Sequence, residues 1–164
     1  MDLVELLMTE HAALRVYFRQ IRELNSPLVF EIDDFVANCH AKIEDELVFP
    51  ALRAIETSPS NRLAAFTKRM EEEHRLLEAL GNDMRVAVGA KGEELDKNKV
   101  ALYVDTLEAH NAGEETLLFR HWKEVSEGQA RSATGDAKST IREFGWARYL
   151  RTTGLSQELL DRVE

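Results

Sequence analysis

The stretch of sequence that decides the fold is His40-Ala-Lys-Ile-Glu44-Asp-Glu-Leu-Val-Phe-Pro50. It places an imidazole and a carboxylate four residues apart in an otherwise apolar helical pattern. Residues i and i+4 lie on one face of an α-helix, so His40 and Glu44 point toward the same region. Burying both side chains is costly unless a partner binds them, and a metal ion is such a partner.

The same pattern returns later in the chain as His110-Asn-Ala-Gly-Glu114-Glu-Thr-Leu-Leu-Phe-Arg120. A second motif also occurs twice, as Glu10-His11-Ala-Ala-Leu14 and as Glu73-His74-Arg-Leu-Leu77. The chain therefore consists of two copies of one helical hairpin. Two such hairpins packed about a pseudo-twofold axis bring four imidazoles and two carboxylates to one level of the core.

Apolar side chains at three- and four-residue steps predict four helices, over about residues 3–24, 32–55, 61–88 and 96–125. Pro50 is expected to kink the second helix or to mark its last turns. Residues 57–61 are expected to form the next loop. Four amphipathic helices joined by short loops predict an all-α fold, an up-down four-helix bundle.

A short C-terminal helical extension is expected to follow the bundle. We divide the chain into a bundle domain, residues 1–127, and an extension, residues 128–164, packed on the bundle. Residues 129–135 lack helical periodicity and are expected to form a mobile connector, whereas residues 138–151 predict a fifth helix. Ser156 is placed to cap a last turn. Alternatively, the aromatic side chains of the extension bind a partner protein.

Composition limits the compartment and the partners of the chain. The 164 residues suffice for one domain, and a net charge of −9 argues against binding to nucleic acid or to anionic membrane lipid. No signal peptide or membrane span is present in the sequence pattern, and the single Cys39 suits a reducing compartment. We therefore expect a cytoplasmic protein, a monomer or a homodimer. No phosphate-binding loop or nucleophile–base pair supports nucleotide or hydrolase chemistry.

The donor set indicates a site for two metal ions. Four imidazoles and two shared carboxylates suit two divalent ions, whereas a mononuclear zinc site needs only three or four ligands. Mixed histidine and carboxylate ligands with open positions fit redox-active iron, with manganese or zinc as substitutes. Carboxylate-rich di-iron bundles use ExxH pairs, and Glu71-Glu-Glu-His74 offers a single one, so a ferritin-like oxidase is the weaker interpretation.

These motifs resemble those of the hemerythrin-like, or HHE cation-binding, domain family. The resemblance rests on His11, His40-x-x-x-Glu44, Glu73-His74 and His110-x-x-x-Glu114, and it covers about residues 3–125. It implies a four-helix bundle that holds two iron ions per chain, bridged by carboxylates and an oxo or hydroxo group. By this resemblance His11 and His40 would hold one iron, His74 and His110 the other, and Glu44 and Glu114 would bridge them.

For function, the resemblance implies a protein that reacts with or senses O₂, nitric oxide or peroxide, in oxidative or nitrosative stress or in iron handling. We expect binding or sensing, with weak peroxidase or oxidase activity left open. The alternative is a metal-stabilised regulatory module whose tail binds a partner protein. Oxygen carriers of the family have a further histidine where this chain has Met70. We expect Glu71, Glu115 or water to complete the coordination there, and reactivity in place of clean O₂ carriage.

His121 is expected not to bind the metals, because it lies about 10 Å along the helix from Glu114. Carboxylates are expected to orient the far ring nitrogens of the ligand histidines, and the sequence leaves open which acids do so.

Overall fold

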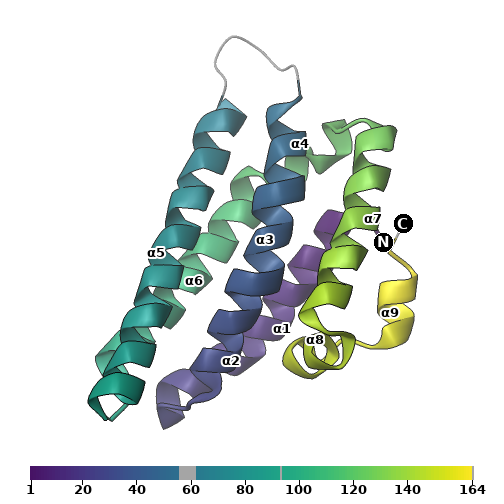
Figure 1. Cartoon of the computed structure of the whole chain (residues 1–164). Helices are drawn as coiled ribbons and strands as arrows, with labels where there is room; N and C mark the ends of the chain where they lie inside the picture. The colour runs from purple at the N-terminus through teal and green to yellow at the C-terminus, as the bar shows by residue number, and fades with distance from the viewer. Residues whose placement is uncertain (56–61, 93, 164) are drawn as a thin grey trace.

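The computed structural model describes residues 1–55, 62–92 and 94–163, with Lys91 described by its backbone alone. The described part of the chain contains helices and no strand, so the all-α prediction is confirmed. Four long helical stretches lie side by side in Figure 1. They are α1 (Leu3–Leu24), the interrupted stretch over residues 28–53, α5 (Arg62–Lys91) and α6 (Lys97–Leu117). The loop expected at residues 57–61 falls outside the described residues.

Helix α1 has the bounds that the sequence predicts. Asp2 and Glu5 form a capping box, in which each side chain accepts a hydrogen bond from the backbone N–H of the other residue. Asn25 ends the helix in the left-handed conformation, with φ 48° and ψ 48°.

The second helical stretch begins at Leu28, earlier than predicted, and contains two π-helical turns. It consists of α2 (Leu28–Phe35), η1 (Val36–His40), α3 (Ala41–Ile43), η2 (Glu44–Val48) and α4 (Phe49–Arg53). The Ala41 N–H bonds to the Val36 carbonyl and the Phe49 N–H to the Glu44 carbonyl, five residues back in each case. Pro50 lies just after the second π turn, in the last helical turns. Turns of this kind occur frequently at functional sites.

Cross-links between the long helices pair residues in opposite order. Between α1 and α6, Arg22 binds Asp105 and Arg15 binds Glu115. The same reversal relates residues 28–53 to α5, through the pairs Arg85–Asp33 and Arg53–Glu71. Each of these two pairs of neighbours is therefore antiparallel.

The fourth predicted helix is shorter than expected. Helix α6 ends at Leu117, and a 3₁₀ helix, η3 (Phe119–Glu124), follows it. Phe119 and Trp122 of this turn are buried. None of the described helices is both long and apolar enough to cross a bilayer.

The extension forms three helices, α7 (Glu127–Phe144), α8 (Trp146–Thr153) and α9 (Gln157–Asp161). The expected connector at residues 129–135 is wrong, because these residues belong to α7, capped by Ser126. Its buried face consists mostly of small residues such as Ala133 and Ala137, so few large apolar side chains mark it in the sequence. Gly145, with φ 106°, divides the predicted fifth helix between α7 and α8. The Ser156 cap is confirmed.

The extension packs mainly against two of the four long stretches, α1 and residues 28–53. Helix α7 contacts α1, η1, α3 and η2, and α8 contacts α1 and α2 (Figure 1). Ile141, Tyr149 and Leu160 of the extension are buried. The two ends of the chain also meet, because the amino group of Met1 donates to the Arg162 carbonyl at 3.3 Å.

Candidate metal centre

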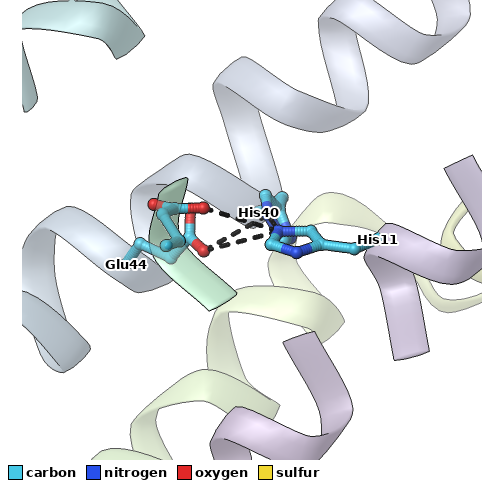
Figure 2. A group of neighbouring side chains, drawn as sticks. His11, His40 and Glu44 are labelled. Carbon is cyan, nitrogen blue, oxygen red and sulfur yellow. Dashed lines mark hydrogen bonds and ion pairs between the residues drawn. The ribbon is translucent and has the colours of Figure 1, made fainter. Parts of the chain in front are cut away.

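Six buried polar side chains converge between the four long helical stretches. The four histidines come one from each stretch and are at most 8% exposed: His11, His40, His74 and His110. Glu44 and Glu114 are fully buried among them. Figure 2 shows His11, from α1, facing His40 and Glu44. The structure thus brings together all six residues that the motifs single out.

The six residues form two groups of four that share both carboxylates. One group is His11, His40, Glu44 and Glu114, and the other is Glu44, His74, His110 and Glu114. Within each group, one ligand atom of every residue lies within 4.8 Å of the others. Each group has the size and chemistry of a site for one divalent cation.

Glu44 directs one oxygen toward each pair of histidines. Its Oε1 lies 3.3 Å from His40 Nε2, and its Oε2 lies 3.4 Å from His74 Nε2. These separations match two ligands of one ion, since atoms about 2.1 Å from a metal at 90–110° angles are about 3.0–3.4 Å apart.

Glu114 repeats this arrangement from α6. Its Oε2 lies 3.5 Å from His11 Nε2, and its Oε1 lies 3.2 Å from His110 Nε2. The Nε2 atoms of His11 and His40 are themselves only 2.9 Å apart. Once the Nε2 atoms are deprotonated, all these atoms can offer lone pairs to a cation.

Most of these inward atoms have no hydrogen-bond partner among the described residues. Both carboxylate oxygens of Glu44 and of Glu114 are buried without one, as are Nε2 of His74 and of His110. Leaving such groups unpaired costs about 1–3 kcal/mol each, and more for charged groups. The donor set therefore fits two bound cations.

Each histidine also has a carboxylate on the opposite side of its ring. The Nδ1–carboxylate distances are 2.6 Å for His40 and Glu10, 3.0 Å for His110 and Glu73, 2.8 Å for His74 and Asp45, and 2.9 Å for His11 and Glu115. An ionised carboxylate only accepts hydrogen bonds, so Nδ1 carries the ring proton and Nε2 keeps its lone pair for a metal.

These four carboxylates follow one rule in both hairpins. Glu10 and Glu73, which precede His11 and His74, each accept from the other histidine of their own hairpin. Asp45 and Glu115, which follow Glu44 and Glu114, each accept from a histidine of the other hairpin. The repeated Glu-His and Glu-acid pairs are a sequence signal that could have identified these carboxylates, although it does not say which histidine each one binds.

The sequence comparison agrees with the geometry. The family model of the hemerythrin HHE cation-binding domain matches residues 2–122. The chain belongs to this family. No curated protein and no solved structure matches it significantly. The matched part of this hemerythrin HHE domain contains all six converging residues and ends before α7.

In the metal-free site the pKa values of the histidines are shifted in different directions. Burial opposes the charge on His40 and His74, but the carboxylates facing them outweigh it, chiefly Glu44 for His40 and Asp45 for His74. The pKa of His40 is thereby raised to about 9 and that of His74 to about 10. Burial lowers the pKa of His11 to about 4, against the effect of Glu115. Protonated His40 therefore donates to Nε2 of neutral His11 at 2.9 Å.

Two expected ligands are bound elsewhere. Glu71 pairs with Arg53, and Glu115 accepts from His11 Nδ1 and from Arg15. The expectation that Glu71 or Glu115 completes the coordination near Met70 is therefore corrected. Met70 itself is buried beside Gly113.

His121 belongs to neither group of ligand atoms. It lies in η3, where its Nδ1 bonds Glu124 at 2.8 Å and its side chain is 27% exposed. This position agrees with the expectation that it is not a ligand.

Tyr149 is the residue near the site that sequence reasoning missed. Its hydroxyl donates to Glu10 Oε1, and its ring is buried in α8. The two residues are 139 positions apart, and no periodic pattern links them.

Proposed function

We propose that this hemerythrin HHE domain holds two iron ions and reacts with or senses O₂, nitric oxide or peroxide. His11 and His40 would hold one ion, and His74 and His110 the other. Glu44 and Glu114 would bridge the two. Family membership supports metal binding, and the two groups of four ligand atoms support two ions.

The observation that carries this proposal is the double role of Glu44 and Glu114. Each directs one oxygen to each pair of histidines, and the described residues supply neither oxygen with a hydrogen-bond donor. One cation would leave the carboxylate oxygens and ring nitrogens of the other half buried and unpaired. Two cations satisfy both halves.

Iron in such a site supplies binding of diatomic ligands and peroxide together with one-electron chemistry. The chain fixes the donors from the outside through the four Nδ1 carboxylates and excludes bulk water through burial. Met70 gives the His74 half one histidine fewer than an oxygen carrier has, and Glu71 and Glu115 are engaged elsewhere. This leaves coordination positions for water or an external ligand, which favours sensing or detoxification in stress or iron handling over O₂ carriage.

Two further features belong to the same proposal. The antiparallel cross-links support an up-down four-helix bundle over residues 1–127, with residues 128–164 as an extension packed on it. The single, buried Cys39 supports a cytoplasmic location.

Metal analysis of the protein reconstituted anaerobically with Fe(II) tests this function. We expect two irons per chain and, after exposure to O₂ or peroxide, near-ultraviolet charge-transfer absorption typical of paired ferric ions. One zinc per chain with a featureless spectrum would contradict it. Repeated uptake and release of O₂ without oxidation of the metal would contradict the sensing or detoxifying role and leave the metal site intact.

A further inference from the structure

The two halves of the site have matching ligands and different supports. Glu10 and Glu73 occupy equivalent places in the two hairpins, and each accepts from Nδ1 of the second histidine of its hairpin, His40 or His110. Glu10 is fully buried, whereas the side chain of Glu73 is 23% exposed. The two carboxylates therefore bind equivalent histidines but differ in their exposure to solvent.

Their second partners also differ in kind. The other oxygen of Glu10 accepts from the hydroxyl of Tyr149. The other oxygen of Glu73 accepts from Arg69, a neighbour on the same helix whose side chain is 64% exposed. An exposed i,i+4 pair of this kind is weak and screened by salt. A buried hydroxyl bonded to a carboxylate is held firmly, because breaking that bond leaves both groups unpaired in the interior.

Tyr149 is itself held in place by aromatic packing. Its ring lies edge-on to Phe35 at 5.8 Å and stacks on Trp146 at 6.4 Å. Phe35 also packs against the ring of His40 at 5.9 Å. Helix α8 is thus fixed against the part of the chain that carries His40, and the phenol has a defined direction.

Hollows of the surface reach the other half of the site. A groove of about 340 Å³ is lined by His74 and its partner Asp45, among others. A second, of about 380 Å³, is lined by His110, Glu73 and Arg69, among others. Neither groove is lined by His11, His40 or Glu10. The segment η1, which carries His40, contacts α7, and α8 contacts α1 and α2 (Figure 1).

We propose that Tyr149 is a positioning residue of the metal centre: through Glu10 it fixes His40 and makes the His11–His40 position the tighter of two metal positions. The His74–His110 position, supported from the surface, is then the one that exchanges metal and admits external ligands. This inference rests on the proposed function, in that it requires two metal positions. It assigns a role in the site to the extension, which lies outside the matched family region.

The test is a titration of the metal-free, full-length protein with cobalt(II), followed by visible absorption. We expect two steps that differ at least tenfold in dissociation constant. His40→Ala should remove the tighter step and His110→Ala the weaker one, which assigns the steps. Tyr149→Phe keeps the ring and removes only the hydroxyl. It should weaken the tighter step about tenfold, the low end of the usual effect of losing an outer partner of a ligand, because Tyr149 acts through Glu10. The weaker step should stay within about threefold.

Arg69→Ala is the matched control, because it removes the corresponding partner of Glu73. Both steps should stay within about threefold of the original. The first equivalent of cobalt should also show a shifted absorption band in Tyr149→Phe, which a merely structural role would not produce. If Tyr149→Phe does not fold, Glu10→Gln replaces it and should weaken the same step about 10–100-fold.

The outcomes separate this inference from the proposed function. Two equal steps in the original protein, or equal weakening of both steps by Tyr149→Phe, would overturn the inference while two-metal binding stands. Failure of the original protein to bind cobalt at all would overturn the proposed function itself.

Discussion

The His11–His40 half and the His74–His110 half of the site have the same ligands, derived from two copies of one hairpin, and differ in what surrounds those ligands. In the first half the supporting Glu10 is buried beneath Tyr149, and in the second the supporting Glu73 lies at the surface with Arg69. If Tyr149 acts as proposed, a repeated sequence fixes the donor atoms while a segment outside the repeat differentiates the two positions.

The largest effect is expected where the two halves are joined. Glu114→Ala removes an oxygen from both metal positions, so we expect metal content after dialysis to fall from about two ions to below one per chain. Atomic absorption measures it. Retention of two ions would show that the halves do not share this carboxylate, and it would contradict the division of the site into two positions joined by Glu114.

The second prediction compares the loss of metal affinity when either supporting carboxylate, Glu10 or Glu73, is replaced. Glu10→Gln should weaken metal binding at its position about 10–100-fold, because a buried amide places a donor where two donors already point. Glu73→Gln should cost only a few-fold, because solvent and Arg69 can adjust around it. Chelator competition measures both variants. Equal losses would mean that burial does not distinguish the two halves.

The third prediction concerns the protons that both halves must release to bind a cation. At neutral pH each contains a histidine whose pKa is raised, His40 to about 9 and His74 to about 10. Both rings are protonated in the metal-free protein and must lose a proton to bind a cation, so affinity should rise by about tenfold or more per pH unit from pH 6 to 8. Calorimetry in buffers of different ionisation enthalpy measures the released protons. Affinity that does not change with pH would contradict it.

The same pKa shifts have the opposite effect on the metal-free fold. Since the pKa values of His40 and His74 are raised above the unfolded value of 6.5, their stabilisation is complete below that pH. It is lost as the pH rises through about 9 and about 10. Urea unfolding of the metal-free protein at pH 7 and at pH 10 should show the lower midpoint at pH 10.

The smallest effect is expected outside both halves. His121→Ala should retain two metal ions and change the free energy of unfolding by less than about 0.5 kcal/mol, since the removed pair with Glu124 is exposed. Metal analysis and thermal unfolding check this. Metal loss equal to that of His74→Ala would place His121 in the site after all.

The sequence was sufficient for the parts of the site that repeat. Each histidine alone is an ordinary core residue, but His11 and His74, or His40 and His110, occur in matching motifs on matching faces. Helix α1 was also predicted to the residue, because Asp2 and Asn25 supply its two ends locally.

The rest depends on contacts that sequence spacing does not encode. Glu10 serves His40 and not the adjacent His11, because neighbouring helix positions point about 100° apart. The Tyr149–Glu10 bond joins distant segments. The buried face of α7 is marked mostly by small residues such as Ala133 and Ala137, in place of the large apolar side chains on which the helix prediction relied.

The first π turn also affects how the second helices of the two hairpins align. Buried residues precede His110 by 3, 6, 7 and 10 positions: Leu107, Val104, Tyr103 and Val100. Buried residues precede His40 by 1, 4, 5, 7, 8 and 11 positions: Cys39, Val36, Phe35, Asp33, Ile32 and Val29. Four of these six, at 4, 7, 8 and 11 positions, repeat the first set displaced by one residue.

The helix accommodates this displacement at η1, where the Ala41 N–H reaches five residues back to Val36. These four core positions therefore align with those of α6 only when a one-residue gap is opened just before His40. The helix widens where it carries His40, while its counterpart α6 stays regular up to Leu117.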